Sequence, residues 1–264
     1  MKKILFILIT SFAITSAFAQ DRSFVRTYQS IVLPKGEKEI EVWSTLRYGR
    51  DEFYRRLDNR FEFEIGLSNK LQTAFYINTS QSSFRAGDEI VTQPTSVSFS
   101  NEWKYKISDP VANAIGSGLY GEYKIGSDEL ELELKLILDK KINKNLFAFN
   151  AVAEFEFEPE VESNEVEQEM EEAKYELDFG YMYQANLHWG IGAELRNVNI
   201  VAESEWKSSP LFFGPTVSYS ADKFWVILNV QPQLMNLKKE EGADNLDLHD
   251  FEKMDVRLIF SFAL

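Results

Sequence analysis

Residues 129–139 read Glu-Leu-Glu-Leu-Glu-Leu-Lys-Leu-Ile-Leu-Asp, with a leucine at every even-numbered position. Side chains alternate between the two faces of a β-strand, so the leucines from Leu130 to Leu138 share one face and the charged residues share the other. A helix would spread the same leucines around its surface. Strands of this kind either bury their leucines in a soluble core or turn them toward lipid in a membrane barrel.

The same two-residue period recurs along most of the chain. Phe61, Phe63, Ile65 and Leu67 alternate with charged residues, and so do the last residues, which end in Phe260, Phe262 and Leu264. The pattern predicts about twelve strands, each long enough to cross a bilayer when tilted. The predicted strands cover residues 40–48, 58–67, 71–79, 96–106, 111–125, 129–139, 146–157, 174–183, 189–201, 211–219, 224–234 and 251–264.

The connections between these segments alternate in length. Short turns at Ser68, Ser108, Lys140, Gln184 and Ser220 are expected on the periplasmic side, and the other side receives the long polar loops 80–94, 158–172, 203–210 and 236–247. Short periplasmic turns with longer external loops are typical of outer-membrane barrels. The sequence therefore favours an all-β, antiparallel transmembrane β-barrel over residues 37–264, and a soluble β-sandwich is the alternative.

The first residues have the order of a secretory signal peptide. Lys2 and Lys3 precede an apolar core at 4–13, and Ala17-Phe18-Ala19 fits a small-residue cleavage site. This order predicts a signal peptide at 1–19, a periplasmic lead-in at 20–36 and export to the outer membrane of a Gram-negative cell. Outer-membrane lipid and lipopolysaccharide are the expected surroundings.

Composition excludes several classes of function. The formal net charge is -14, so the surface is expected to repel nucleic acid. The chain has no cysteine, so we expect no disulfide. Its only histidines, His188 and His249, are isolated, so we expect neither a metal site nor a Ser–His hydrolase. It carries no phosphate-loop or dinucleotide motif. We expect a protein that is not an enzyme and uses no cofactor.

The charged faces of the strands define the candidate site. They are expected to line the barrel lumen, either as a hydrated, cation-favouring passage or as a salt-bridge lattice that fills the interior. The predicted lumen-lining residues are Arg60, Glu62, Glu64, Glu131, Glu133, Lys135, Glu154, Glu176, Asp178, Glu194, Arg196 and Arg257.

Two features concern the edges of the predicted barrel. Pro215 and Pro232 fall inside predicted strands, where each removes a ladder hydrogen bond, so Pro215 is expected at a bulge and Pro232 near a rim. The five tryptophans lie mostly near strand ends, which suits interfacial girdles, with some aromatic side chains turned inward. They are Trp43, Trp103, Trp189, Trp206 and Trp225.

Short stretches also resemble a known family. Residues 28–43 (Tyr-Gln-Ser-Ile-Val-Leu-Pro-Lys-Gly-Glu-Lys-Glu-Ile-Glu-Val-Trp), 65–71, 190–194 and 213–219 resemble outer-membrane barrels of the phenol-degradation meta-pathway family. The resemblance implies a transporter-like barrel without naming a solute. The terminal strand resembles the signal by which the barrel-assembly machinery recognises its clients, although it ends in Leu264 where phenylalanine is commoner.

The sequence leaves two functions open. One is a passive channel or transporter for small solutes. The other is a non-transporting barrel that binds at the cell surface, or supports the envelope, through acidic external loops such as 158–172.

Overall fold

The computed structural model describes residues 22–264 except 128, 163–164, 203–204 and 240–243, and the side chains of residues 158–171 are also outside the description. The predicted signal peptide, 1–19, lies outside the described residues. Within them the chain forms β1 (Lys38–Tyr48), β2 (Tyr54–Ser68), β3 (Leu71–Ala86), β4 (Glu89–Thr92), β5 (Ser96–Ser108), β6 (Gly116–Ile125), β7 (Leu130–Ile142), β8 (Asn145–Glu162), β9 (Glu165–Gln184), β10 (Trp189–Ala202), β11 (Glu205–Ser208), β12 (Pro210–Ser220), β13 (Phe224–Asn236) and β14 (Met254–Ala263).

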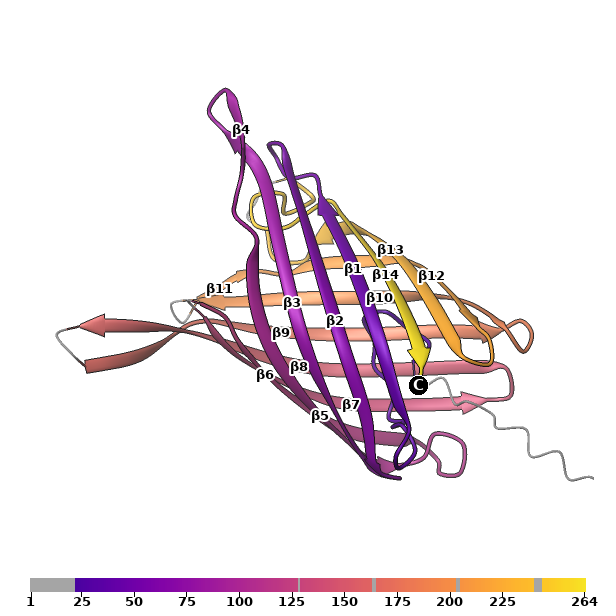
Figure 1. Cartoon of the computed structure of the whole chain (residues 1–264). Helices are drawn as coiled ribbons and strands as arrows, with labels where there is room; N and C mark the ends of the chain where they lie inside the picture. Colours follow the sequence, from indigo (N-terminus) through magenta and orange to yellow (C-terminus); the bar gives the residue numbers. More distant parts are fainter. Residues whose placement is uncertain (1–21, 128, 163–164, 203–204, 240–243) are drawn as a thin grey trace, which may run out of the picture.

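Twelve long strands close into one antiparallel barrel, because β14 pairs with β1 and β9 pairs with β10 (Figure 1). The short strands β4 and β11 only extend hairpins beyond the wall, by pairing with β3 and β10. Short turns join the strands at the end where the C-terminus lies, and the extended hairpins project from the opposite end (Figure 1). The predicted barrel of about twelve strands is confirmed.

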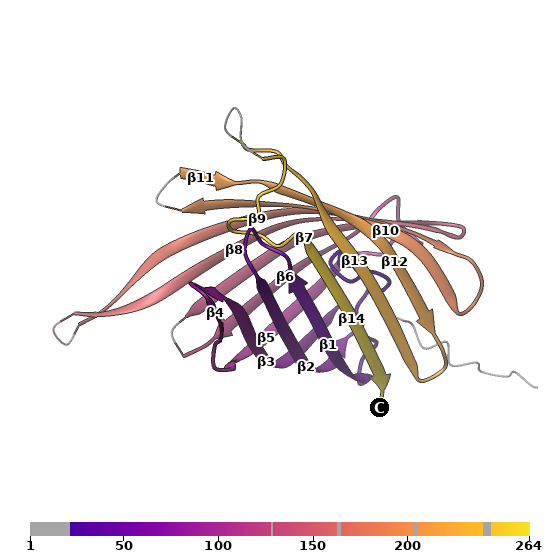
Figure 2. The same cartoon turned by 90° about the horizontal axis from the view of Figure 1, so that it is seen from above.

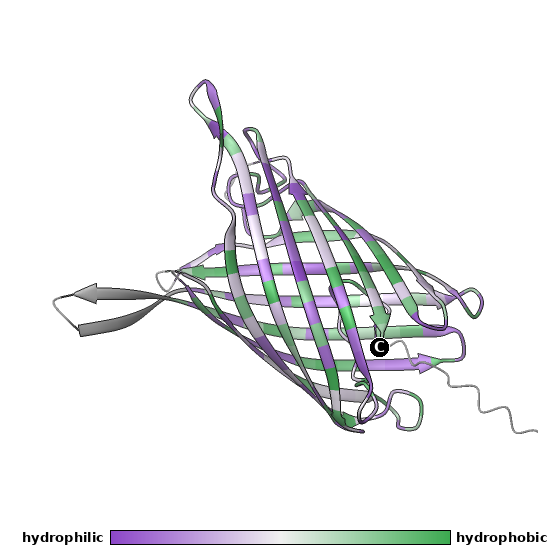
Figure 3. Ribbon diagram, in the orientation of Figure 1, coloured by the Kyte–Doolittle hydropathy of each residue, from purple (hydrophilic) through white to green (hydrophobic). Residues whose placement is uncertain are grey.

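Polar and apolar residues alternate along the strands of the wall (Figure 3), and the apolar ones are exposed on the outer face while polar ones line the lumen. In β7, Leu132, Leu134 and Leu136 are exposed on the outside, whereas Glu131 and Glu133 point inward. Each leucine that leaves water for lipid contributes about 1.5–3 kcal/mol, which fixes the register of every strand. Among the described residues, no helix is long and apolar enough to span a membrane.

Two predicted loops are hairpins instead. The segment 80–94 continues β3 and returns as β4, with Gly87 at a φ of 63° in the tight turn that joins them. Residues 158–162 and 165–172 belong to the backbone ladder of β8 and β9, which pair as far as Glu162 and Glu165. The error has a physical cause, since these hairpins stand beyond the apolar band and carry no alternating apolar face to mark them as strands.

The two prolines lie where the ladder is weak. Pro232 occupies the last pair of the β13–β14 ladder, opposite Met254, as expected for a residue near a rim. Pro215 pairs with Ala193 of β10, but residues 213–215 have no partner in β13. The expected irregularity at Pro215 is therefore present.

The N-terminal segment differs from its prediction. The sequence predicted a periplasmic lead-in at 20–36, whereas residues 22–33 lie inside the ring of strands (Figure 2). Phe24, Val25, Tyr28, Val32 and Leu33 are all at most 5% exposed. We call residues 22–33 the plug. Its apolar side chains leave water by packing on apolar residues of the inner wall, which is why the segment folds inward.

Candidate functional site

Polar side chains of the wall hold the backbone of the plug. The Glu194 carboxylate accepts hydrogen bonds from the backbone N–H groups of Val25, Arg26 and Thr27, at 2.9, 2.6 and 2.9 Å. Asn150 accepts from the N–H of Tyr28 and donates to its carbonyl. These groups satisfy a buried chain that has no sheet partner of its own, as buried backbone groups require.

Further contacts hold the plug nearer the short-turn end. Asp139 accepts from the Ser30 hydroxyl at 2.6 Å, and the Gln72 side chain accepts from the N–H of Leu33 at 2.7 Å. The chain then leaves the barrel at Gly36, whose N–H donates to the carbonyl of Gly66 in β2.

The inner wall is shaped to receive the plug. Phe24 packs with Leu146, Ala148 and Met182, and an added Cβ at Gly180 would lie 2.8 Å from its ring. A second apolar cluster joins plug and wall, and its members are Val25, Tyr28, Trp43, Tyr120, Ile137, Trp225, Ile227 and Ile259. Apolar and glycine positions on an otherwise polar inner face therefore mark where the plug docks.

Two arginines of the plug interact with the wall in different ways. The Arg22 guanidinium lies 4.0 Å from the centre of the Tyr28 ring and 4.3 Å from that of Trp43, and its charge interacts with Glu41 and Glu62. Arg26 forms an ion pair with Asp255 of β14. The plug is thus fixed by charge as well as by apolar contact.

A cavity of about 430 Å³ occupies the lumen beyond the plug, toward the long-hairpin end. Val25, Arg26 and Tyr28 of the plug contribute to its lining. In all, ten carboxylate side chains and nine cationic side chains, Arg26 included, line it. The volume is within the range of ligand-binding pockets.

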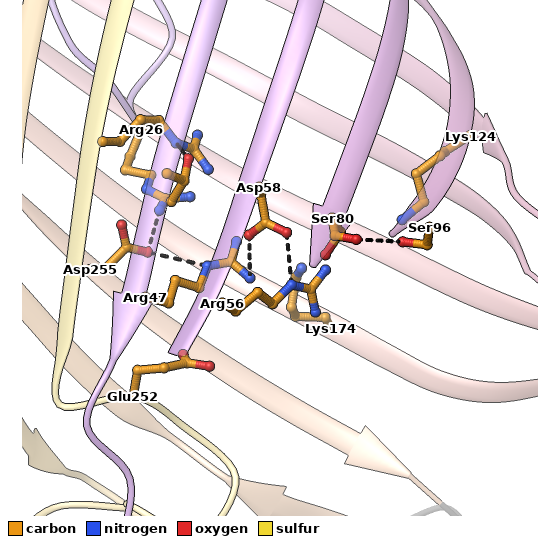
Figure 4. A network of polar contacts seen from close by, with 12 residues as sticks. Arg26, Arg47, Arg56, Asp58, Ser80, Ser96, Lys124, Lys174, Glu252 and Asp255 are labelled. Atoms are coloured by element: carbon orange, nitrogen blue, oxygen red, sulfur yellow. Dashed lines mark hydrogen bonds and ion pairs between the residues drawn. The ribbon is translucent and has the colours of Figure 1, made fainter. Parts of the chain in front are cut away.

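One wall of the cavity is rich in arginine (Figure 4). Asp58 lies between Arg47 and Arg56, at 3.5 and 2.7 Å, and the buried Asp255 links Arg47 to Arg26. We call the following set the arginine wall: Arg26, Arg47 of β1, Arg56 and Arg60 of β2, and Arg257 of β14. Asp58 is the one cavity-lining carboxylate of β14, β1 and β2 among the described residues.

A second wall is rich in carboxylates. Three lysines pair with some of them: Lys124 with Glu129 at 2.9 Å, Lys135 with Glu133 at 2.8 Å, and Lys174 with Glu154. We call the following set the carboxylate wall: Glu129 just before β7, Glu131 and Glu133 of β7, Glu154 and Glu156 of β8, and Glu172, Glu176 and Asp178 of β9. The carboxylates in this wall outnumber the lysines that pair with them.

The two walls face each other across the lumen. Going round the barrel, β3, β5 and β6 separate β2 from β7, and β10, β12 and β13 separate β9 from β14. The strands β14, β1 and β2 are therefore diametrically opposite β7, β8 and β9. Neutral polar side chains of β3 and β5, including Ser80 and Ser96, line one side between the two walls (Figure 4).

The predicted lumen residues fall into two groups. Nine of them line the cavity: Arg60, Glu131, Glu133, Lys135, Glu154, Glu176, Asp178, Arg196 and Arg257. Glu194 instead binds the plug. Glu62 and Glu64 are buried among the carboxylates of the neighbouring strand β1, where carboxylate oxygens of Glu39, Glu41 and Glu64 lie within 4.8 Å of one another.

Sequence reasoning missed several cavity residues. Arg26 lies in the segment predicted as periplasmic, and Arg56 lies where the sequence predicted a connection. Arg47 and Asp58 lie at the ends of predicted strands but were not named as lumen residues. Arg56 and Asp58 precede Arg60 at intervals of two residues, and this spacing is the signal that would have identified them as inward residues.

The remaining predicted features are distributed over the surface. His188 lies in the β9–β10 turn and contacts the Ser220 carbonyl, whereas His249 lies in the β13–β14 connection beside Asp250. Trp103, Trp189 and Trp206 are exposed on the outside, in keeping with interfacial positions. Trp43 and Trp225 are instead buried inside, where their indole N–H groups donate to Glu41 and Glu39.

Comparison with solved structures gives the same fold in proteins of different roles. The COG4313 outer membrane channel from Pseudomonas putida F1 aligns with a TM-score of 0.65 and 11% identity over 91% of this chain and 100% of its own. The KdgM porin in complex with disordered oligogalacturonate gives 0.52 and 12%, over 86% and 99% of the two chains. The translocator domain of the autotransporter NalP from Neisseria meningitidis gives 0.56 and 6%, over 86% and 88%.

These likenesses support the barrel fold and, with the apolar outer face, an outer-membrane location. The predicted resemblance to outer-membrane barrels is confirmed, whereas the phenol-degradation meta-pathway assignment stays a prediction. No curated protein matches the chain. A model for a family of unknown function (DUF6662) matches residues 16–264, so the chain belongs to that family.

Proposed function

We propose that the protein is an outer-membrane channel for small polar solutes, closed in the present state by its plug. The observation that carries the proposal is the charged cavity of about 430 Å³ inside the barrel. A barrel whose interior served only as a salt-bridge lattice would have no reason to keep such a space. Opposite charges pair along each wall, as Lys135–Glu133 and Arg56–Asp58 do, and Arg60 of β2 also reaches Glu122 of β6.

The plug decides when the channel conducts. Its residues occupy the lumen between the cavity and the short-turn end, and Ser30 and Thr27 are fully buried there. A solute that enters from outside reaches Arg26 and Tyr28 and can pass only if the plug moves. The plug is one short segment without a sheet partner, held by polar and apolar contacts of its side chains and backbone, which suits reversible displacement better than a permanent seal.

The alternative function is a barrel that never transports and acts at the cell surface or in the envelope. The occupied lumen favours this alternative, because the docked plug lies in the path through the barrel. The side chains of 158–171, which would form its acidic binding surface, lie outside the described residues. The phenol-degradation meta-pathway resemblance supports the channel proposal through its transporter-like members, without naming a solute.

Single-channel recording separates the two functions. The chain from Gln20 is refolded and inserted in planar bilayers, beside a variant that lacks residues 22–33. Heat-modifiable migration in gels identifies folded barrels in both samples. Phe24→Ala, which shortens one anchor and keeps the segment, serves as a milder second variant.

The channel proposal predicts rare conductance steps for the intact chain, more frequent steps for Phe24→Ala and steady conductance for the deletion. Silence from folded protein in all three samples would overturn it in favour of the non-transporting barrel. Steady conductance from the intact chain, unchanged by Phe24→Ala, would retain the channel and remove the role of the plug.

A further inference from the structure

We infer that the cavity selects small zwitterions, with a carboxylate turned to the arginine wall and an ammonium group turned to the carboxylate wall. The inference rests on the proposed function for its role in passage. It concerns binding, however, and can be tested without transport. Its basis is the segregation of opposite charges onto facing sides of one cavity.

The two walls give the cavity a transverse electric field. Guanidinium groups are charged at any physiological pH, so the arginine wall stays positive. The carboxylate wall holds eight acidic side chains against Lys124, Lys135, Lys174 and Arg196, which lies 4.0 Å from Glu176. A molecule that lies between the two walls and carries a negative charge at one end and a positive charge at the other is attracted at both ends. The low dielectric constant of the protein behind each wall strengthens the field.

Each wall keeps charge that its own ion pairs do not neutralise. The Arg257 guanidinium donates through Nε to the Thr45 hydroxyl at 2.7 Å and has no carboxylate within ion-pair distance among the described residues. On the other side, Asp178 and Glu156 have no cation within that distance in the described part of the chain, and Asp178 Oδ1 is buried without a hydrogen-bond partner. These are the groups that a bound solute can satisfy.

The overall charge of the cavity distinguishes a zwitterion from a simple ion. Ten carboxylates and nine cations nearly cancel, although the whole chain carries a net charge of -14. A simple anion gains attraction at the arginine wall and loses it to repulsion from the opposite wall, and a simple cation meets the reverse. A molecule with both charges gains at both walls, so amino acids and short peptides fit the chemistry.

The test compares four solutes of similar size and different charge. They are 4-aminobutyrate, which is a zwitterion, the cation 4-aminobutanamide, the anion succinamate and the neutral succinamide. Binding to the detergent-purified full barrel is measured by saturation-transfer nuclear magnetic resonance at neutral pH and low salt. Passage of the same solutes is measured separately by swelling of vesicles that contain the barrel.

Variants remove one charge at a time. Arg257→Gln removes an unpaired cation, and Asp178→Asn removes an unpaired carboxylate with little change of shape. Lys70→Gln and Asp222→Asn remove the same charges from exposed turns at the short-turn end and serve as matched controls. We expect the zwitterion to bind about threefold more tightly than each of the other solutes, in keeping with the strength of solvated ion pairs.

The variants should change selectivity in opposite directions. Arg257→Gln should remove the advantage of 4-aminobutyrate over the cation, Asp178→Asn its advantage over the anion, and the controls neither. Equal binding of all four solutes, or tightest binding of a simple ion, would overturn the inference even if the vesicles swell. Selective binding without swelling would keep the inference and refute the channel.

Discussion

Replacing Glu194 should release the plug, because this one carboxylate holds three consecutive backbone N–H groups. It also accepts from the hydroxyl groups of Thr27 and Thr216. Glu194→Ala leaves the three backbone N–H groups and these two hydroxyl groups without their acceptor. A hydrogen bond to a charged group is worth about 1.5–3 kcal/mol, and water that enters the space recovers part of the loss. We take about 4 kcal/mol as the net weakening of plug docking.

That loss raises the ratio of displaced to docked plug about a thousandfold, at about 1.4 kcal/mol for each factor of ten. Glu194→Gln keeps one acceptor oxygen and the side-chain shape but loses the charge. Its expected loss of about 2 kcal/mol raises the ratio about thirtyfold. The two substitutions thus predict a graded response from one position.

The assay uses a single cysteine as a reporter. Ser30 is fully buried in the docked plug, and the chain has no cysteine of its own, so Ser30→Cys can be labelled only when the plug leaves the wall. When docking is fast, the labelling rate follows the displaced population. We expect the rate to rise about thirtyfold with Glu194→Gln and about a thousandfold with Glu194→Ala. A rate within threefold of the parent in both, from folded barrels, would refute the reasoning.

Further predictions concern the plug, the lipid face and one turn. Gly180→Val should displace Phe24, whose ring lies 2.8 Å from the added Cβ, and weaken docking by about 1–3 kcal/mol, measured as faster Ser30→Cys labelling. Leu134→Lys on the lipid face should cost about 2–4 kcal/mol in urea unfolding from vesicles, and Leu134→Ile far less. The backbone N–H groups of Ala112 and Val111 lower the pKa of Asp109 below its usual 3.8. The Asp109 carboxylate should therefore stabilise the fold fully above pH 3.8, and this stabilisation should be lost as the pH falls through the lower pKa of the folded state. Asp109→Asn should remove this pH-dependent loss of stability.

The barrel could be predicted because its pattern has a direct physical cause. Every wall strand must show lipid one face and water the other, so residues such as Leu134 and Glu133 alternate wherever the chain crosses the membrane. The hairpin of β8 and β9 beyond the membrane has no such constraint, and its sequence carries no apolar alternation that would distinguish a strand from a loop.

The plug could not be predicted from its own residues. Gln29 and Ser30 read as solvated, and the segment has no period-two pattern. The part of the wall that contacts the plug did carry a signal. Ile137 and Gly180 occupy inward positions, where a fully hydrated lumen would not need an apolar side chain or a glycine.

The cavity was partly predictable for the same reason. The period identifies which side chains point inward, and Glu131 and Arg257 follow from it. The position along the barrel axis at which the plug ends determines which inward residues face the cavity. Glu194 therefore binds the plug, whereas Glu131 lines the cavity. That position is a tertiary property, absent from any single strand.

A reversible cross-link between plug and wall tests the central claim most directly. An added Cβ at Gly118 lies 3.6 Å from the Ser30 Cβ, within the range that a disulfide spans. Ser30→Cys with Gly118→Cys should therefore form the one disulfide of the chain. Single-channel current should be absent when the bond is oxidised, and the rare conductance steps of the intact chain should return when reductant is added to the same bilayer. Current that is equal before and after reduction, from protein shown to be fully cross-linked, would contradict a channel closed by its N-terminal plug.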